Sequence, residues 1–353
     1  MSEVWALLRR YAPLIDKHIE KHIPRSFNLD ALERICGKPR YGYDLHALNE
    51  AVAKPLWDLL DRGGKRWRPS LFLTVYEALG GNPEDVLDYA VIPEVIHNGT
   101  LIVDDVEDDS EYRRGKPCIH RIYGVDIAIN VGNLMYYLPL TILLRDERLS
   151  ERKKNRIYEM YIEEMIRLSI GQAMDIAWHR GLSPHVTEEQ YMQMCAYKTG
   201  TLARFSAKLA AILADVDEEK VESVGRFAEA IGVAFQIQDD ILNLVGEPEK
   251  YGKEIGGDIT EGKRTLMVIH TLEKASPEDK KRLIEILNMH TRDPKLIAEA
   301  ISIIKKYGSI EYAKEVSKRI MKEAWNEIDG WLPPSKAKEA LEALARFLIE
   351  REL

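Results

Sequence analysis

The chain has 353 residues, of which 45% are hydrophobic and 31% are charged, and its formal net charge is −8. This composition is typical of a soluble globular protein, and the acidic balance without a basic tract argues against a nucleic-acid-binding protein. The three cysteines, Cys36, Cys118 and Cys195, lie far apart in the sequence, so we expect no disulfide framework and a reducing, cytoplasmic location.

From the N-terminus onward, the sequence predicts a succession of helices. The first segment carries charges throughout and lacks the apolar core of a signal peptide. Apolar residues recur at spacings of three and four in residues 89–108 and 219–245, whereas the alternation typical of strands is scarce. No low-complexity linker divides the chain. We therefore predict one all-α domain over residues 1–353, with ten or more helices.

The most apolar run, residues 127–144, is long enough to resemble a membrane span. It is interrupted by Asn130, Gly132, Asn133 and Pro139, which are unusual in a lipid-facing helix. We interpret it as a buried helix of a large helical protein and expect no transmembrane segment.

An acidic cluster lies in DDVEDDSEYRRG, residues 104–115. Asp104 and Asp108 are four positions apart, so on a helix they share a face, while Asp105 points about 100° away and serves as a further or supporting ligand. Hard cations such as Mg²⁺ bind one or two protein carboxylates and complete their shell with water and phosphate oxygens. The alternative interpretation is a solvated, acidic helix end.

A second acidic pair, Asp239 and Asp240, stands in AFQIQDDILN among apolar residues and is followed by Asn243. Like charges in apolar surroundings repel each other and lose hydration unless cations compensate them. Two such clusters facing each other would hold several Mg²⁺ ions and hence a polyphosphate. Asn243 offers only a neutral oxygen where a third carboxylate could stand.

Basic residues accompany the acidic clusters, often beside glycines that let the backbone approach an anion: Lys65 with Arg68, Arg113 with Arg114, Lys198, and Lys253 with Lys263. The glycines around Lys253 and Lys263 suggest a loop that closes over phosphates. Such a chain can bind two phosphorylated ligands, one through metals and one through direct Lys and Arg contacts.

At this point the chain resembles the trans-isoprenyl diphosphate synthases, all-α enzymes with a central cavity. The resemblance rests on GGKRWRP, DDVEDDSEYRRG, GQAMD, KTG, FQIQDD and GKEIGGD, which follow one another in the family's order over roughly residues 55–270. The stretches HNGTLIVDDVEDDS and IAINVGN are similar to the geranylgeranyl diphosphate synthases in particular. The family resemblance also implies a homodimer.

The resemblance implies a metal site of three Mg²⁺ ions, with Mn²⁺ as a substitute. Its metal-binding residues would be Asp104, Asp105, Asp108, Asp239 and Asp240, with Asp105 and Asp240 giving support together with Gln172 and Asp175. The catalytic set would be Asp104, Asp108, Arg113, Lys198, Asp239 and Lys253.

The two substrate sites follow from the same resemblance. Isopentenyl diphosphate would be bound by Lys65, Arg68, His97 and Arg114, with Phe235 over its alkenyl part. The allylic diphosphate (dimethylallyl, geranyl or farnesyl) would be bound by Arg113, Lys198, Lys253 and Lys263, with the oxygens of Thr199 and Gln236 facing the developing cation. Loss of pyrophosphate would give an allylic cation that the double bond of isopentenyl diphosphate captures in trans.

The product tail would run along the helix that carries Asp104. In this family an aromatic residue four or five positions before the first aspartate blocks the tail at the farnesyl length, but here Thr100 and Gly99 are small. A helical glycine is otherwise unfavourable, which suggests a space-making role for Gly99, with a packing contact as the alternative. The expected lower floor is Ile96, Val95, Met135, Tyr136 and Tyr137.

We expect geranylgeranyl diphosphate as the product. The alternatives are a longer polyprenyl diphosphate of at least geranylfarnesyl length, a class I terpene cyclase, and a non-catalytic partner subunit of an active synthase. A cyclase would carry an Asn/Ser/Glu metal motif in place of the second aspartate pair and would not need Lys65, Arg68 and His97. Asn243 is the residue that keeps the partner-subunit interpretation open.

Overall fold

The computed structural model describes residues 2–183, 185–246 and 255–349, and its architecture is all-α, as predicted. The first half of the chain forms α1 (Ser2–His22), α2 (Leu29–Cys36), α3 (Leu45–Leu48), η1 (Asn49–Ala53), α4 (Lys54–Asp61), α5 (Trp67–Ala78), η2 (Pro83–Val86), α6 (Leu87–Glu107), α7 (Ile119–Tyr123), α8 (Val125–Tyr137), η3 (Leu138–Leu140), α9 (Thr141–Leu144) and α10 (Glu151–His179).

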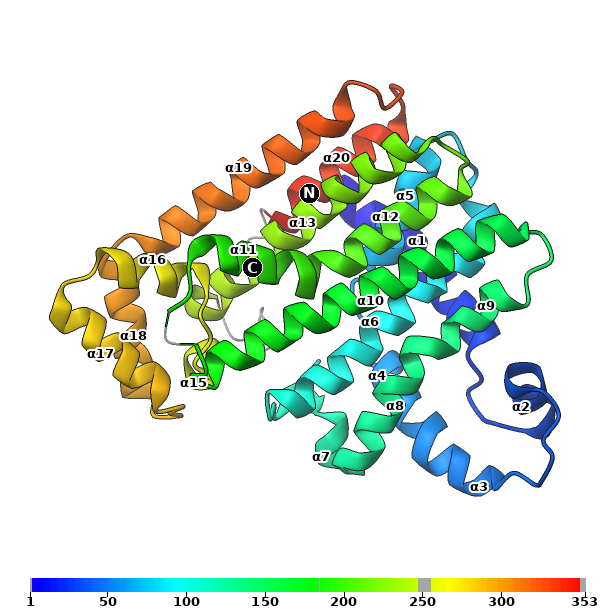
Figure 1. Cartoon of the computed structure of the whole chain (residues 1–353), viewed down its shortest axis with the longest axis horizontal. Coiled ribbons are helices and arrows are strands. Elements are labelled where there is room, and N and C mark those ends of the chain that lie inside the picture. Colours follow the sequence, from blue (N-terminus) through cyan, green and yellow to red (C-terminus); the bar gives the residue numbers. More distant parts are fainter. Residues whose placement is uncertain (1, 184, 247–254, 350–353) are drawn as a thin grey trace.

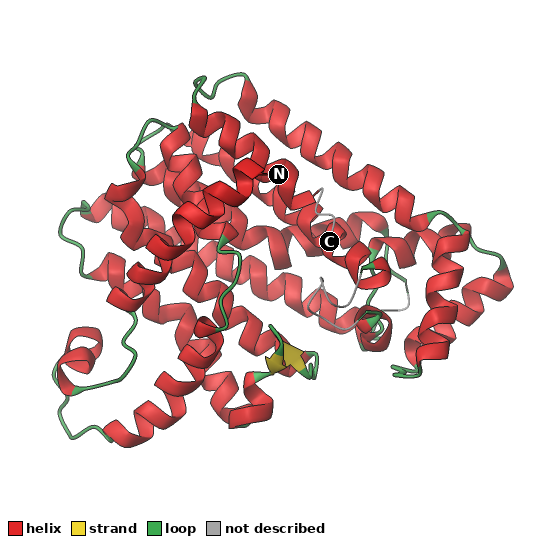
Figure 2. Ribbon diagram, turned by 180° about the vertical axis from the view of Figure 1, so that it is seen from behind, coloured by secondary structure: helices red, strands yellow, loops and turns green. Residues whose placement is uncertain are grey.

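The second half continues the helical array and closes it. Its elements are α11 (Glu188–Cys195), η4 (Ala196–Gly200), α12 (Thr201–Leu213), α13 (Glu218–Val245), α15 (Gly257–Glu261), α16 (Leu266–Lys274), α17 (Pro277–Asn288), α18 (Pro294–Lys306), α19 (Ser309–Asp329) and α20 (Lys336–Ile349). A single pair of two-residue strands, β1 (Tyr112–Arg113) and β2 (Lys116–Pro117), was not predicted; it is the yellow hairpin in Figure 2.

The long helices begin at side-chain caps that the sequence supplies. The Ser150 hydroxyl accepts a bond from the Lys153 amide at the start of α10, and Asp217 caps α13 through the Lys220 amide. Such caps satisfy amide groups that the first helical turn leaves without partners. They fix where α10, which carries Asp175, and α13, which carries the second acidic pair, enter the bundle (Figure 1).

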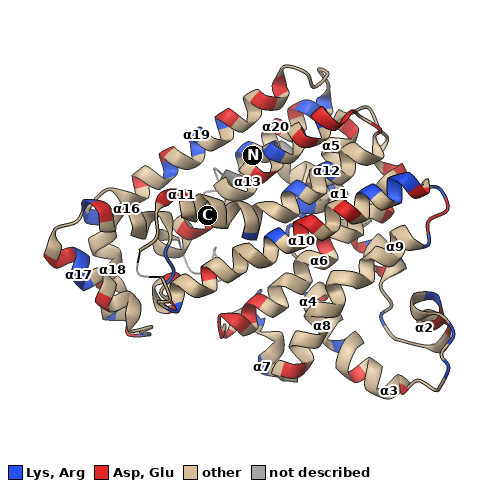
Figure 3. Cartoon of the chain, viewed as in Figure 1, with Lys and Arg blue, Asp and Glu red and all other residues tan. Residues whose placement is uncertain are grey.

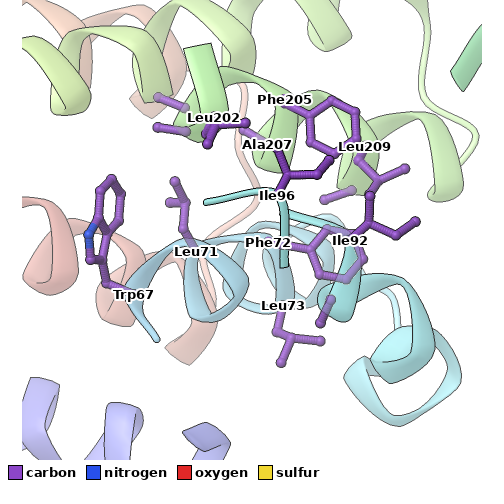
Figure 4. Close-up of a cluster of buried hydrophobic side chains, with 14 of the residues drawn as sticks. Trp67, Leu71, Phe72, Leu73, Ile92, Ile96, Leu202, Phe205, Ala207 and Leu209 are labelled. Atoms are coloured by element: carbon purple, nitrogen blue, oxygen red, sulfur yellow. The ribbon is translucent and has the colours of Figure 1, made fainter. Parts of the chain in front are cut away.

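In the described residues the hydrophobic core has one large cluster, a second, smaller one, and a third of four residues that includes Phe27 and Val52. The large cluster packs α5 and α6 against α12, and Figure 4 shows Phe72, Ile96 and Phe205 among its side chains. The second cluster joins α16–α18 to the C-terminal half of α13, and Ile320 of α19 packs against both clusters. Ile320 therefore links the two clusters.

The apolar run at residues 127–144 differs from the buried helix that we expected. It is divided among α8, η3 and α9, and Ile129 and Tyr137 are exposed while Val131 and Met135 are buried. Two stretches, Pro83–Glu107 and Val125–Leu144, are long and apolar enough to cross a membrane, and 72% and 44% of them are buried inside the protein. The second stretch therefore presents one apolar face to the outside.

Candidate active site

A cavity of about 970 Å³ lies among α6, α8, α10, α13 and the segments that join them. Sixteen of the predicted site residues line it: Lys65, Arg68, His97, Thr100, Asp104, Asp108, Arg113, Arg114, Tyr136, Lys198, Thr199, Phe235, Gln236, Asp239, Asp240 and Lys263. Figure 3 shows acidic residues gathered at the C-terminal end of α6. Lys253, which we expected in the allylic site, lies outside the described residues.

The first acidic cluster stands where α6 ends. Asp104 is in the last turn, and Asp108 is the C-cap residue, whose amide donates to the Asp104 carbonyl over 2.9 Å. The i, i+4 geometry that the sequence predicted is therefore kept across the helix end. Burial opposes ionisation of Asp104, but the charges of Lys198 and Lys263 outweigh it and hold the pKa of Asp104 below its ordinary value.

Two lysines reach this cluster from opposite walls and meet at Asp175 on α10. Lys198 Nζ lies 3.2 Å from Asp104 Oδ1 and 2.7 Å from Asp175 Oδ2. Lys263 Nζ lies 3.1 Å from Asp108 and 2.8 Å from the same Asp175 oxygen. Burial disfavours the charged lysines, but the carboxylates raise the pKa of both above the ordinary value. The cavity thus holds two fixed positive charges close to the predicted metal ligands.

Lys263 owes its position to the preceding glycine. Gly262 has φ +70, and a Cβ there would lie 2.9 Å from both His290 and the Leu287 carbonyl oxygen. Any larger residue would have to adopt a left-handed backbone in a space that is already filled. Gly262 is therefore required for the turn that directs Lys263 into the cavity.

Asp105 was predicted as a further or a supporting metal ligand, and its geometry favours the supporting role. Asp105 is 1% exposed and does not line the cavity; Arg113 holds its carboxylate through Nε at 3.0 Å and Nη2 at 2.5 Å. The reason is helical periodicity, which turns residue 105 away from the face shared by Asp104 and Asp108. Asp105 is a support for Arg113, whose Nη2 also lies 3.7 Å from Asp104 Oδ2.

The β1–β2 hairpin separates the two adjacent arginines. Arg113 is the last residue of β1, and Arg114 and Gly115 form the two-residue turn that leads to β2. Their φ values are 53 and 75, so both residues of this hairpin turn have a left-handed backbone. Arg113 therefore turns to Asp105, and Arg114 donates from Nη1 to Asn98 Oδ1 over 3.0 Å. Neighbours in sequence thus serve different parts of the cavity.

The second acidic pair lies on α13, and its two members differ. Both line the cavity, but Asp240 is only 6% exposed and accepts hydrogen bonds from the Tyr191 hydroxyl and the Gln236 amide, both over 2.7 Å. Burial, together with the Asp239 charge, raises the pKa of Asp240. Because each Asp240 oxygen already has a donor, this geometry favours the supporting role among the two that we expected, and metal binding by Asp240 stays a prediction.

Other polar residues on this wall are also paired. Thr199 donates from its hydroxyl to the Gln236 amide oxygen over 2.7 Å, so these two predicted residues stand together. The Asn243 side-chain oxygen accepts the Asp258 amide over 3.0 Å. Asn243 therefore anchors the start of α15 through its side-chain oxygen.

The cationic region lies beside the first turn of α5. Arg68 Nη1 lies 3.2 Å from His97 Nε2, and its guanidinium stacks over Trp67 with 4.4 Å to the ring centroid. Burial lowers the pKa of Arg68 to about 10, so it remains charged at neutral pH. Burial and the charge of Arg68 lower the pKa of His97 well below its usual value, so His97 is neutral. Its Nε2 accepts a hydrogen bond from the Arg68 guanidinium. Phe235 packs against Trp67, with 5.0 Å between ring centroids.

Sequence reasoning missed the residues that hold this region in place. Arg66 caps α5 with φ 50, a left-handed conformation that is rare for arginine, and donates to Glu94 Oε1 over 2.7 Å. Asn98 donates to the same Glu94 oxygen over 2.9 Å and accepts from Arg114. A glutamate inside the apolar run PEVIH was the available signal, since such an acid must be paired when it is buried.

Gly99 has a packing role and not the space-making role that we expected. A Cβ on Gly99 would lie 2.8 Å from the Met135 Cβ and 2.9 Å from the Gly132 carbonyl oxygen, so this glycine lets α6 touch α8. Gly99 does not line the cavity, and neither does Ile96, which belongs to the core in Figure 4. Thr100 and Tyr136 do line it.

Three further residues named as a floor are placed elsewhere. Val95 and Met135 are fully buried in the large core cluster, and Tyr137 is 63% exposed. Of the residues named as a floor, Tyr136 lines the cavity, and Val103, Leu168 and Leu202 from α6, α10 and α12 line it as well.

Residues 49–304 match the family described as polyprenyl synthetase. A short chain isoprenyl diphosphate synthase of Methanothermobacter thermautotrophicus is 36% identical over 352 residues, covering 100% of both chains. A geranylfarnesyl diphosphate synthase of Natronomonas pharaonis is 33% identical over 311 residues, covering 83% of this chain and 88% of the relative. The crystal structure of a geranylgeranyl pyrophosphate synthetase from Pyrococcus horikoshii is 37% identical, covers 99% of both chains and has a TM-score of 0.85.

Proposed function

The chain belongs to the polyprenyl synthetase family and is a trans-isoprenyl diphosphate synthase, and from this premise we propose that it makes geranylgeranyl diphosphate in a Mg²⁺-dependent reaction. The substrates are isopentenyl diphosphate and an allylic diphosphate. One observation carries the proposal: Asp104, Asp108 and Asp239 line the same cavity as a separate cationic group around Arg68. The cyclase and partner-subunit alternatives lose their support, because both acidic clusters and the cationic group are present.

The donor set fits Mg²⁺. Asp104, Asp108 and Asp239 offer only oxygen, the ligand that this hard cation prefers, and they leave positions for phosphate oxygens. When bound, Mg²⁺ neutralises the allylic diphosphate and makes pyrophosphate a better leaving group. Gln172 orients Asp104 by donating to Oδ1 over 2.8 Å. The number of ions, three by family resemblance, and replacement by Mn²⁺ are parts of this proposal.

The cationic side chains divide between the two substrates. Lys198 and Lys263, already charged and buried at the first cluster, exchange carboxylate contacts for oxygens of the allylic diphosphate. Their positive charges stabilise the negative charge that builds up on pyrophosphate as the C–O bond breaks. The oxygens of Thr199 and Gln236 line the path of the allylic cation.

The second substrate is held by Arg68, Lys65 and Arg114, with Phe235 over its alkenyl group. Neutral His97 fixes Arg68 instead of adding a positive charge. The double bond of isopentenyl diphosphate forms the new C–C bond to the allylic carbon, and the released pyrophosphate accepts the proton that is then lost. Packed aromatic rings such as Trp67 and Phe235 exclude water, which would otherwise capture the cation.

Product length follows from the floor of the cavity. The bulky side chains of Tyr136 on α8 and Leu168 on α10 line the cavity, and a tail that ends against them supports geranylgeranyl diphosphate. A second candidate is geranylfarnesyl diphosphate, because the exposed Asn133 and Ser169 also line the cavity, so its wall reaches the surface between α8 and α10.

The same surface supports a homodimer. Exposed isoleucines follow one another at helical spacing along α10, at Ile162, Ile166 and Ile170, and α8 adds Ile129 and Tyr137. Contiguous apolar side chains of this kind are characteristic of a contact surface in a soluble protein. We place a second copy of the chain on this face. We also propose that the enzyme is cytoplasmic and has no membrane-spanning segment.

The test is an incubation of the full chain with labelled isopentenyl diphosphate and each allylic primer in turn, with and without Mg²⁺. Chromatography of the dephosphorylated products should show mainly the geranylgeranyl alcohol, and chelation of Mg²⁺ should abolish it. A product that stops at the farnesyl length, or no incorporation with any primer, contradicts the proposal. Light scattering in the same buffer reports the mass of the homodimer.

A further inference from the structure

Two histidines and an aspartate meet at the end of α6 that lies away from the active site. His18 and His22 are four residues apart on α1, so they share one face of its last turns. His18 Nδ1 lies 2.8 Å from Asp88 Oδ1, and His22 Nε2 lies 2.7 Å from the same oxygen. These ligand atoms all lie within 4.8 Å of one another, and in the part of the chain that the structure describes they form one such His/Cys/Asp/Glu group.

The group is independent of the prenyltransferase site. Asp88 is in the first turn of α6 and Asp104 in the last, so roughly 24 Å of helix separates them. None of the three residues lines the active-site cavity. Their side chains are 15–21% exposed, which shields the group from bulk water while leaving a small ion access.

The chemistry of the group differs from that of the acidic clusters. Two imidazole nitrogens and one carboxylate oxygen are a ligand set that suits Zn²⁺ and related ions such as Co²⁺, whereas Mg²⁺ prefers oxygen alone. Three protein ligands leave a fourth tetrahedral position for water. Bonds of about 2.0–2.2 Å would place the ligand atoms about 3.3 Å apart, so His18 and His22 need to withdraw from Asp88 Oδ1 by only about 0.5 Å.

The neighbours of Asp88 orient its carboxylate for this role. Arg148 Nη2 lies 3.4 Å from Asp88 Oδ2 and 2.6 Å from Asp146 Oδ2. Arg148, which is not one of the three ligand residues, therefore holds the second Asp88 oxygen in place. Oδ1 faces the two histidines and also accepts from Lys21 over 2.8 Å. The Lys21 side chain is 57% exposed and can move away from Asp88, so its ammonium group would compete with a metal ion for Asp88 Oδ1.

We propose that His18, His22 and Asp88 form a Zn²⁺-class metal site that fastens the end of α1 to the start of α6. The alternative is a hydrogen-bond cluster in which the histidines and Lys21 neutralise Asp88 without a metal. The two differ in the effect of Lys21: it competes with a metal ion in the first case and helps to hold the cluster in the second.

The experiment titrates the full chain, freed of transition metals, with ZnCl₂ in excess Mg²⁺ and follows heat release. The excess Mg²⁺ keeps Zn²⁺ from the carboxylates at Asp104 and Asp108. We expect one bound Zn²⁺ per chain, loss of this binding in His18→Ala and His22→Ala, and severalfold tighter binding in Lys21→Met. The exposed Lys17→Met is the matched control and should bind Zn²⁺ like the unchanged protein.

A second readout uses CoCl₂, whose visible absorption reports its ligands and should be weaker in both histidine variants. Prenyltransferase activity with Mg²⁺ shows that each variant is folded, because these residues lie far from the cavity. Zn²⁺ binding that is absent, or that both histidine variants retain, overturns the proposal. So does Lys21→Met if it weakens Zn²⁺ binding.

Discussion

Arg66 and Glu94 form an ion pair of 2.7 Å inside the protein, where their side chains are 4% and 3% exposed. The pair joins the start of α5, where Lys65 precedes the helix and Arg68 lies in its first turn, to α6, which carries His97. Through Asn98 it also reaches Arg114. Arg66, Glu94 and Asn98 therefore hold in place the residues of the proposed isopentenyl site.

Glu94→Gln should weaken this arrangement. Removing the buried Glu94 charge leaves Arg66 with the more exposed Asp16 as its remaining ionic partner, so we expect a loss of about 3 kcal/mol in the free energy of unfolding. The KM for isopentenyl diphosphate should rise severalfold while that for the allylic primer changes little. Asp16→Asn is the control, since Asp16 binds the same Arg66 but is 54% exposed and should cost less than about 1 kcal/mol. Equal effects of both variants contradict the prediction.

Gly99→Ala should separate a packing role from a space-making role. The added Cβ would press on Met135 and the Gly132 carbonyl, so we expect a loss of about 1–3 kcal/mol in unfolding free energy with unchanged product length. Gly330→Ala is the control, because a Cβ there meets nothing within 4 Å. Denaturant unfolding and product chromatography measure the two effects. A shorter product without loss of stability would restore the space-making role.

Tyr136→Ala should lengthen the product. Its ring lines the cavity beside Thr100, so its removal opens room for a further isoprene unit. We expect geranylfarnesyl diphosphate to become a main product at a similar rate of primer consumption. Tyr137→Ala changes the adjacent tyrosine, which is 63% exposed, and should leave the product distribution as it is. Identical distributions for both variants would exclude Tyr136 as part of the floor.

Tyr191→Phe should impair the second acidic pair. The lost hydroxyl donates to Asp240, and a hydrogen bond to a charged group is worth about 1.5–3 kcal/mol, so kcat should fall at least about tenfold. The Mg²⁺ concentration for half-maximal rate should rise. Tyr158→Phe removes a buried hydroxyl that has no hydrogen-bond partner, and it should leave both parameters unchanged. A Tyr191→Phe enzyme with normal Mg²⁺ dependence would contradict the supporting role of Tyr191.

His97 should not titrate in the working range of the enzyme. Because burial and the nearby arginines lower its pKa well below the usual value, His97 is neutral at every pH above that lowered value, including pH 6 to 8. His97→Gln should therefore change the KM for isopentenyl diphosphate by the same factor at each pH between 6 and 8. A factor that grows or shrinks across the range would show that the imidazole gains a proton there.

The sequence was sufficient for features that depend on local periodicity. Asp104 and Asp108 share a face because they are one turn apart, and the helical pattern predicted the all-α fold. For Asp105 and Asp240 the sequence left open whether they bind a metal ion or support its ligands, and in the structure each has a hydrogen-bond partner, Arg113 and Tyr191. Which neighbour of a paired aspartate faces the cavity depends on packing between distant segments.

Two other features were beyond sequence reasoning for geometric reasons. The separation of Arg113 from Arg114 requires a two-residue turn with left-handed backbone at a non-glycine residue, which the sequence did not indicate. The role of Gly99 depends on the register in which α6 crosses α8, a relation between segments that are distant in the chain. A helical glycine alone is compatible with either role.

The backbone contact of α6 with α8 at Gly99 and Gly132 has a mechanical consequence. Helices that meet through glycines cannot slide along each other without a clash, so the carboxylates at one end of α6 and the ring of Tyr136 keep a constant spacing. In the proposed mechanism this fixed spacing sets the length of the product. A change of product length then requires a different side chain at Tyr136 and not a change in helix packing.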